Sequence, residues 1–489
     1  MKKAIALFTL ILLCLNSFSQ TWLKVACGAQ FSVALRSDGT LWSWGANKSN
    51  AGQLGLDIGS TTHIETPTQI GSDHDWKDIA AGAAHCLALK SSGTMWAWGW
   101  NYGGEIGDGT TIQRNSPVQA GTDNDWKNVY CGMLCSYAIK NDGSLWAWGW
   151  TYMGQLGIGQ TTESYNKTPT QVGTDKDWLM VSGGGAAVIV GGALTSAGYA
   201  LGLKTDGTLW AWGANEHGEL GDGTTQEKYS PVKIGNDNNW RQLATGLSSS
   251  SALKSDHTLW SWGDNFLGAL GIGNELQQSA PVQASGTDWN QLTRGPSYGL
   301  AIKTNGTLWG WGQNSNGQLG DGTKVKKLSP VLIGNDNDWS FIAAAKAVLA
   351  NNNTTVVGYH SLGMKNQKTF LCSTGRNVDG QLGNGTTADQ SSFSCDVVTS
   401  IQETNQEKNT IEVFPNPGSG EFNISFASKQ QDCTMDFHNA IGQLLLREDW
   451  NKASGIYTKH FNLGSLEKGI YFLSVKEKEH MEVKKIIFY

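Results

Sequence analysis

Charge is scarce in this sequence. Asp, Glu, Lys and Arg make up 16% of the 489 residues, and the formal net charge is −6. Proteins bind nucleic acid or anionic membranes through clustered Lys and Arg, which an acidic chain of low charge density does not supply on average. The composition therefore argues against nucleic acid as a partner.

The sequence also lacks short motifs that carry common enzyme chemistry. It contains no GxxxxGK[ST] phosphate loop and no HExxH zinc pair. The nine histidines are scattered, and a CxxxC pair at Cys131 and Cys135 has no second pair to complete a zinc site. We expect no enzyme, no cofactor and no metal, although an active site assembled from distant segments would leave no such motif.

Long apolar runs are confined to the N-terminus. A basic start, MKK, precedes an apolar segment over residues 4–15, and small serines precede a cleavage point near Ser19. This pattern predicts a secretory signal peptide over residues 1–19, with an uncleaved anchor as the alternative. No later run is long enough to cross a bilayer, so no membrane span is expected in the mature protein.

Cysteines are few for a chain of this length. Export to an oxidising compartment allows disulfides, and Cys372–Cys395 or Cys131–Cys135 could form within a single blade. The odd number left after signal cleavage indicates that disulfides are not the scaffold. These cysteines are Cys27, Cys86, Cys131, Cys135, Cys372, Cys395 and Cys433.

Glycine (62 residues) and tryptophan (22 residues) are abundant, and they recur in a repeat. Its centre reads DGTLWSWG at residues 38–45 and is followed by a glycine turn, GQLG. A degenerate last copy, QKTFLCSTG at residues 367–375, places Phe370 and Cys372 where tryptophans are expected. Self-similarity at a period near 50 residues indicates stacked structural units. A further tryptophan opens each unit, at Trp22, Trp76, Trp126, Trp178, Trp240, Trp289 and Trp339.

Each unit predicts a small antiparallel sheet. In LKVACG, FSVALRSDG and TLWSWG, apolar residues alternate with small or polar ones, and the DG pair marks a hairpin turn. Such a sheet cannot bury both faces alone, but seven sheets packed radially can. The expected fold class is all-β: a seven-bladed β-propeller over residues 20–400, followed by a small C-terminal β-sandwich. Because no opening-tryptophan strand follows the last unit, we expect an N-terminal strand to complete the last blade.

The WxWG core, the GQLGDG turn and the DG hairpin resemble the regulator of chromosome condensation repeat family. The resemblance covers about Thr21 to Val398 and implies a seven-bladed propeller. Units four and seven depart from the pattern by insertions at the same place, at about Gly184–Ser196 and Ala344–Val357. We expect the insertions to emerge at one shared face, where loops build binding sites, or to cap a neighbouring blade.

The composition changes after a polar linker at residues 401–410, and short alternating strands predict the small β-sandwich over residues 411–489. FPNPGSGEFNISF, LEKGIYFLSV and VKKII resemble the C-terminal sorting domain of type IX secretion cargo, although that family usually ends on Lys or Arg and this chain ends IIFY. The resemblance implies a Bacteroidetes-type bacterium and the type IX secretion machinery as partner of residues 411–489. It also implies passage through the periplasm, then release or anchoring at the outer cell surface.

The candidate binding site is a set of aromatic residues directly after the WG pairs. These are Trp100 and Tyr102 in unit two, Trp150 and Tyr152 in unit three, and Phe266 in unit five. Equivalent positions on adjacent blades should lie side by side on one rim, where flat amphipathic rings suit sugar stacking or a protein hot spot. Local packing within the turns is the alternative interpretation.

Acidic turns such as SDHDW, TDNDW and NDNDW precede the opening tryptophans. A DxD spacing is compatible with calcium, which takes clustered oxygen ligands. Its recurrence in nearly every unit favours a structural role, with Asp and Asn hydrogen-bonding their own backbone in a turn between blades.

The sequence therefore predicts a secreted or cell-surface, non-enzymatic binding module whose partner is an unknown protein or glycan. A polysaccharide-binding adhesin and an inhibitor of a secreted enzyme are the alternatives, and an extracellular enzyme is less expected. Nucleotide exchange on a small GTPase, which the wider family includes, needs an intracellular partner and conflicts with export.

Overall fold

The computed structural model describes residues 21–47, 51–58, 63–160, 165–190, 193–345, 348–351, 354–365, 369–395, 412–414, 421–428, 432–439, 443–451, 455–462, 469–477 and 480–488. The chain divides into two compact units, Met1–Ile401 and Gln402–Tyr489. The expected signal peptide (1–19) and linker (401–410) lie outside the described residues.

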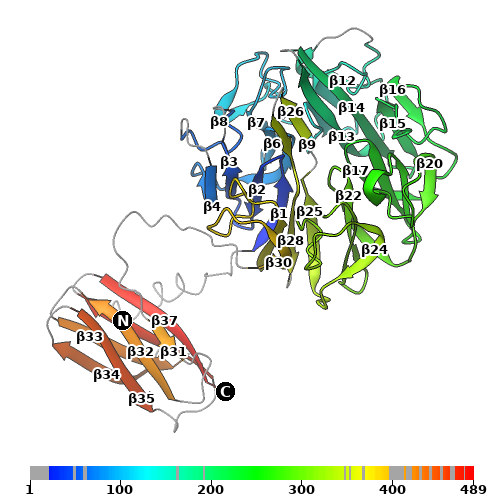
Figure 1. Cartoon of the computed structure of the whole chain (residues 1–489). Helices are drawn as coiled ribbons and strands as arrows, with labels where there is room; N and C mark the ends of the chain where they lie inside the picture. The colour runs from blue at the N-terminus through cyan, green and yellow to red at the C-terminus, as the bar shows by residue number, and fades with distance from the viewer. Residues whose placement is uncertain are drawn as a thin grey trace. The chain divides into compact units, whose positions relative to one another are not determined.

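The described residues of the first unit form seven sheets, one for each sequence repeat, and successive strands within each blade are antiparallel (Figure 1). The expected all-β propeller is confirmed. The first three blades are β1 (Trp22–Cys27), β2 (Phe31–Arg36), β3 (Leu41–Ala46) and β4 (His63–Ile70); β5 (Trp76–Ala81), β6 (His85–Lys90), β7 (Met95–Gly99) and β8 (Arg114–Gln119); and β9 (Trp126–Cys131), β10 (Cys135–Lys140), β11 (Leu145–Trp150) and β12 (Tyr165–Gln171).

The remaining blades repeat this order, and a short 3-10 helix, η2 (Phe266–Gly268), follows the third strand of blade five. They are β13 (Trp178–Val190), β14 (Ala193–Lys204), β15 (Leu209–Gly213) and β16 (Lys228–Lys233); β17 (Trp240–Thr245), β18 (Ser249–Lys254), β19 (Leu259–Gly263) and β20 (Gln278–Gln283); β21 (Trp289–Arg294), β22 (Tyr298–Lys303), β23 (Leu308–Gly312) and β24 (Lys327–Ile333); and β25 (Trp339–Ala344), β28 (His360–Lys365), β29 (Phe370–Gly375) and β30 (Gln390–Ser394).

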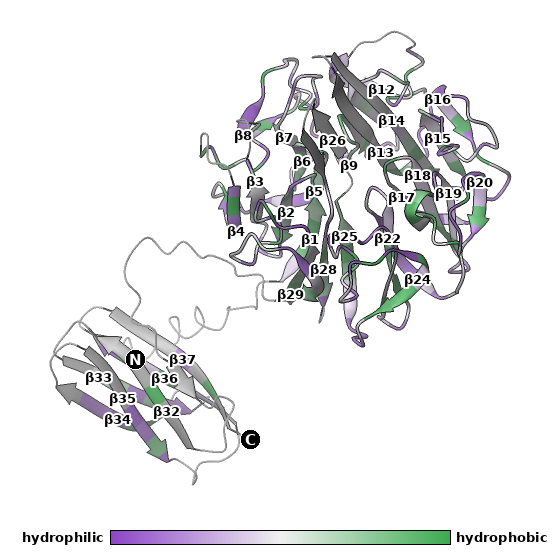
Figure 2. Ribbon diagram, in the orientation of Figure 1, coloured by the Kyte–Doolittle hydropathy of each residue, from purple (hydrophilic) through white to green (hydrophobic). Residues whose placement is uncertain are grey.

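The first strand of every blade lies at the centre. These strands contact one another in a ring that runs from β1 to β25 and back to β1. They line a cavity of about 200 Å³, with small side chains such as Ala26, Ala80 and Ala343 on its wall. The fourth strands are outermost and partly exposed, and β8 is hydrophilic over most of its length (Figure 2). The core therefore lies between blades, where both faces of each inner sheet are covered.

The expected closing strand is wrong. β1 pairs with β2 in the first blade, and blade seven is completed by its own fourth strand, β30. Each repeat begins with its innermost strand, so the repeat boundaries coincide with the blade boundaries. The ring closes by side-chain contacts between blades seven and one: the Ser32 hydroxyl donates to the Gln381 carbonyl over 2.9 Å, and its oxygen lies 3.1 Å from His360 Nε2.

A hydrogen bond recurs at successive joints between blades. The second tryptophan of the WxWG core donates its indole N–H to the carbonyl of the second residue of the preceding blade's GxLGxG turn. The Trp98–Gln53 distance is 3.1 Å and the Trp148–Glu105 distance is 2.9 Å. Each indole also covers a glycine of that turn. At Gly107, whose φ is +79°, a Cβ atom would lie 2.7 Å from Trp148 Nε1. The turn glycines are thus required where the indole of the next blade approaches.

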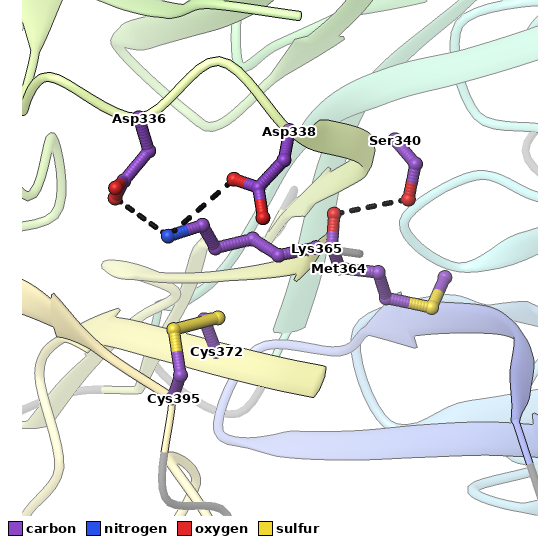
Figure 3. Close-up of a disulfide and its surroundings, with 7 residues drawn as sticks. All are labelled: Asp336, Asp338, Ser340, Met364, Lys365, Cys372 and Cys395. Atoms are coloured by element: carbon purple, nitrogen blue, oxygen red, sulfur yellow. Dashed lines mark hydrogen bonds and ion pairs between the residues drawn. A yellow bond between two sulfur atoms is a disulfide. The ribbon is translucent and has the colours of Figure 1, made fainter. Parts of the chain in front are cut away.

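In blade seven, the residues at the two tryptophan positions differ from those expected from the sequence repeat. Strand pairing places Cys372, not Phe370, at the first tryptophan position and Thr374 at the second. The missing indole is replaced by Phe393 of β30, whose ring lies 4.8 Å from that of Trp339 and against Gly320. Of the two disulfides that the sequence allows within a blade, Cys372–Cys395 is present (Figure 3), whereas Cys131 and Cys135 are not bonded to each other and Cys135 hydrogen-bonds Tyr137.

The two insertions meet, as expected for a shared face. In blade four the insertion lengthens β13 and β14, and in blade seven it forms β26 (Val348–Asn351) and β27 (Thr354–Val357). β26 pairs in parallel with β13, with Val188 opposite Ala350, so that one six-stranded sheet joins two blades that are not neighbours (Figure 1). We call this pairing the bridge.

The second unit consists of two antiparallel sheets, as expected for a small β-sandwich. One contains β31 (Glu412–Phe414), β32 (Glu421–Ser428) and β35 (Gly455–Asn462). The other contains β33 (Asp432–Asn439), β34 (Leu444–Asn451), β36 (Gly469–Glu477) and β37 (His480–Phe488). Phe437 and Tyr471 stack with ring centroids 5.4 Å apart and are buried.

Candidate binding face

One face of the propeller carries both features that the sequence singled out. Adjacent strands within a blade are antiparallel, so the connections after the first and third strands lie at the same edge. The insertions follow first strands and the candidate aromatic residues follow third strands. We call this the insertion face. The hairpin turns and acidic turns lie on the opposite face.

In five blades a buried asparagine holds the long connection on the insertion face, whereas blade three has Thr151 at this position. In blade two, Asn101 Nδ2 donates to the carbonyls of Thr110 (3.1 Å) and Ile112 (3.0 Å), while its Oδ1 accepts the Ile106 amide over 2.9 Å. Asn215, Asn265, Asn314 and Asn377 make the same contacts in later blades. The residue after this asparagine stands on a fixed loop, and Tyr102 in that position is 61% exposed.

Four aromatic rings lie in two contacting pairs at the joint between blades two and three. Trp100 lies 4.6 Å from Tyr102, and Trp150 lies 5.8 Å from Tyr165, measured between ring centroids. Trp150 links the two pairs because its indole covers Gly103, where a Cβ would lie 2.1 Å from Nε1. We call Trp100, Tyr102, Trp150 and Tyr165 the aromatic patch.

The residues of the patch show both local packing and exposure for binding, the two roles considered for these aromatic residues. Trp100 and Trp150 are half-buried and pack locally, whereas Tyr102 and Tyr165 are exposed. Lys167 Nζ lies 5.8 Å from the Tyr165 ring, which adds a cation at the patch edge. Rigid aromatic rings with a polar rim suit a sugar or a protein hot spot. Tyr165 escaped the sequence analysis because it lies on the outermost strand, outside the repeated motif.

The remaining candidates lie elsewhere on the face. Tyr152 is half-buried in the loop of blade three. Phe266 is 67% exposed on blade five, with blade four between it and the patch. It shares its loop with the exposed Leu276, whose carbonyl accepts Asn265 Nδ2 over 3.1 Å. The structure therefore brings Trp100, Tyr102 and Trp150 together and leaves Phe266 as a separate exposed group.

The acidic turns on the opposite face bind lysines, a role that differs from the expected backbone turn. Lys90 Nζ lies 2.6 Å from Asp73 and 3.1 Å from Asp75, and it also lies over the rings of Trp76 (4.8 Å) and Trp96 (4.9 Å). Figure 3 shows the equivalent pair Asp336 and Asp338 holding Lys365. Within the described ranges, no group of three or more His, Cys, Asp or Glu residues could hold a metal ion. The sequence feature that could have predicted this lysine-binding role is the lysine that ends the second strand of most repeats.

Burial shifts the pKa values of several groups near the insertion face. Glu105 is fully buried beneath the aromatic patch, and desolvation raises its pKa to about 8. Hydrogen bonds from the backbone and the approach of the Trp150 indole N–H only partly oppose this rise. His85 and His360 are buried beside serines, and desolvation lowers their pKa values to about 4 and about 3. These imidazoles are therefore neutral in the folded chain at neutral pH.

Comparison with known proteins agrees with this architecture. A family model of the regulator of chromosome condensation (RCC1) repeat matches residues 38–89, 92–139, 142–190, 206–253 and 305–346, and a second model of the same repeat matches residues 22–53 and 76–105. The model of the secretion system C-terminal sorting domain matches residues 412–489. The chain belongs to the RCC1 repeat family and ends in a sorting domain, which indicates type IX export to the cell surface or the medium.

Individual relatives share the repeat rather than the whole chain. The E3 ubiquitin-protein ligase HERC2 of Homo sapiens is 42% identical over 90 residues, which are 18% of this chain and 2% of the ligase. The ultraviolet-B receptor UVR8 of Arabidopsis thaliana is 32% identical over 213 residues, 43% of this chain and 45% of the receptor. The chain thus spans less than half the length of these curated relatives.

Solved structures show the same fold. Prp20p from Saccharomyces cerevisiae superimposes with a TM-score of 0.61 at 20% identity, over 80% of this chain and 90% of Prp20p. Human WBSCR16 gives a TM-score of 0.57 at 23% identity, over 67% of this chain and 86% of its own. Among the described residues, no helix has the length and apolar character needed to cross a bilayer.

Proposed function

We propose that this chain is a non-enzymatic binding protein of the cell surface or medium, which captures a glycan or a protein through its insertion face. The observation that carries the proposal is the aromatic patch, whose blade-two loop is fixed by the buried Asn101 and which lies on the same face as the bridge. RCC1 repeat propellers mostly serve as binding and regulatory modules, which favours binding over catalysis. Export would begin with a signal peptide at residues 1–19 and pass through the periplasm.

The test uses the full chain against a glycan array and a surface-proteome pull-down. The variant Tyr102→Ala/Tyr165→Ala removes the two exposed rings of the patch, and Phe266→Ala removes an equally exposed ring on blade five. Losing a hot-spot aromatic costs about 2 kcal/mol or more, so we expect the double variant to bind at least tenfold more weakly. The thermal midpoint should stay within a few degrees of wild type, because both rings are exposed.

The outcomes separate the two partner classes. A glycan bound by wild type and by Phe266→Ala, but not by the double variant, supports a sugar-binding adhesin. A protein partner with the same profile supports an inhibitor-like module. Saturable binding that the double variant leaves unchanged contradicts the proposal that the patch is the binding site.

A further inference from the structure

The turn that supports the aromatic patch carries a buried glutamate where four other repeats carry glutamine. The GxLG turn carries glutamine in four blades, at Gln53, Gln155, Gln318 and Gln381. Three of these side chains accept the backbone N–H two residues earlier: Met153 N to Gln155 Oε1 (2.8 Å), Asn316 N to Gln318 Oε1 (3.0 Å) and Asp379 N to Gln381 Oε1 (2.9 Å). In these blades a neutral amide fills the position. Blade five has Ala269 there, and blade four has Glu219, whose pKa burial also raises.

Blade two places Glu105 there. Its Oε2 accepts the Gly103 amide over 2.9 Å, in the way that the glutamines accept theirs. The side chain has no exposed surface, and Oε1 makes no hydrogen bond of good geometry in the described part of the chain. A neutral carboxylic acid has nearly the shape of glutamine and fits this place, whereas a carboxylate would be a buried charge without a counter-ion.

Among the residues that the structure describes, no cation faces Glu105 from the elements packed around it. Cys135 on β10 is buried, and desolvation raises its pKa to about 12, so its thiol is neutral. Ser136 donates to the Glu105 carbonyl (2.8 Å) and contacts His85 Nε2 (3.0 Å), an imidazole that burial keeps neutral. On its own loop, Asp108 is paired with Arg114, and on β12 the Lys167 ammonium lies over the Tyr165 ring. Trp150 on β11 offers only an indole N–H.

The carboxyl group connects directly to the aromatic patch. The Gly103 amide that it accepts follows Tyr102 in the chain, and Gly103 is the surface on which the Trp150 indole rests. A change at Glu105 therefore acts on the contact that joins Tyr102 in blade two to Trp150 in blade three.

We propose that Glu105 is a positioning residue for the aromatic patch and acts as a neutral carboxylic acid, so that the patch is ordered in acidic and neutral medium and loosens when the group ionises. The inference rests on the proposed function in taking the patch as the ligand surface. The raised pKa of Glu105 agrees with it.

The direction in which pH changes the opening of the loop follows from proton linkage. Opening of the loop hydrates Glu105 and returns its pKa from about 8 toward the ordinary glutamate value of 4.5. The open state therefore binds fewer protons, and opening becomes easier by up to about tenfold per pH unit between about pH 5 and pH 8. Above pH 8 both states are ionised, and the effect levels off. Replacement by glutamine removes this dependence.

The test is amide hydrogen exchange of the peptide over residues 100–109, measured on the full chain at pH 5 to 9. Each rate is divided by that of Glu105→Gln at the same pH, which cancels the intrinsic pH dependence of exchange. We expect this ratio to rise by up to about tenfold per unit and to reach a plateau near pH 8. The matched control is Glu219→Gln in blade four, whose carboxylate accepts His217 N over 2.7 Å and lies away from the patch. It should leave the 100–109 peptide like wild type.

A ratio that stays flat across this range overturns the proposal, as does a Glu105→Gln variant that exchanges faster than wild type at pH 8. Near-ultraviolet circular dichroism verifies that both variants are folded. Because exchange is measured without a ligand, a flat ratio refutes the role of Glu105 while leaving the binding proposal standing. Failure to find any glycan or protein ligand would refute the binding proposal and leave the role of Glu105 in the loop standing.

Discussion

The indole N–H of Trp44, in the first blade, donates to the carbonyl of Gln381, in the last blade, over 2.9 Å. The same indole covers Gly383, where φ is +73° and a Cβ would lie 2.7 Å from Nε1. This is the contact made at the interior joints, for example between Trp212 and Gln155 at 2.9 Å. The joint that closes the ring is thus built like the joints within it, although its partners are 337 residues apart in sequence.

We expect Trp44→Phe to destabilise the protein by about 2 kcal/mol, because it removes one of the two hydrogen bonds to the buried Gln381 carbonyl and leaves a small void. Trp212→Phe, at an interior joint, is the control and should cost a similar amount. Urea unfolding followed by circular dichroism measures both. If Trp44→Phe leaves the free energy of unfolding unchanged while Trp212→Phe lowers it, the closing joint contributes little stability.

The disulfide in blade seven should stabilise the fold in proportion to the loop it closes. Cys372 and Cys395 are 23 residues apart, and a loop of this size is worth about 3 kcal/mol in the chain-entropy description. Cys372→Ser/Cys395→Ser should therefore unfold at a lower temperature than oxidised wild type. A reducing agent should lower the wild-type midpoint and leave the variant unchanged. Equal midpoints before and after verified reduction would contradict this.

Acid should destabilise the propeller through its buried histidines. The pKa values of His85 and His360 are about 4 and about 3 in the folded chain, below the ordinary value of 6.5. The unfolded state therefore binds more protons below pH 6.5, and stability falls from there toward pH 4 and pH 3. Phe31 occupies the equivalent position in blade one. We expect His85→Phe/His360→Phe to show a shallower loss of thermal midpoint over this range, and parallel profiles would argue against the assignment.

The lysine sites on the opposite face should contribute unequally. Lys90 combines two aspartates with two indoles, whereas Lys303 lies over Trp289 and Trp309 (4.9 Å each) and has no ion pair among the described residues. Lys90→Met should cost about 1–2 kcal/mol, and Lys303→Met less, because a cation–π contact alone is worth about 0.5–1 kcal/mol when exposed. Raised salt should reduce the difference. Equal losses for both would mean that the aspartates add nothing.

Much of the fold could be predicted from the sequence because the repeated residues are those that pack the joints between blades. The tryptophans and the turn glycines meet at the joints, so their spacing reports the blade itself. The closing strand was mispredicted because a cyclic repeat can be divided at any strand, and only pairing shows that Trp22 opens a blade. Blade seven was misaligned because Phe393 supplies from a neighbouring strand the ring that Thr374 lacks.

The candidate site could be predicted only in part. Trp100, Tyr102 and Trp150 stand at fixed offsets from the WG pairs, so their common rim followed from the repeat. Tyr165 joins them through strand pairing with Trp150, which no local motif announces. Glu105 did leave a signal, since it stands where four repeats have glutamine, but its meaning depends on burial, which the substitution alone does not reveal.

The bridge connects two blades of the propeller that are not adjacent in the ring. Propellers are held by contacts between successive blades, so the failure of one joint opens the whole circle. The pairing of β13 with β26 acts as a chord between blades four and seven and divides the circle into two smaller circuits. If the joint between blades seven and one parts, the circuit of blades four to seven is still closed. The ends of the propeller can then separate without unravelling the half that the chord encloses.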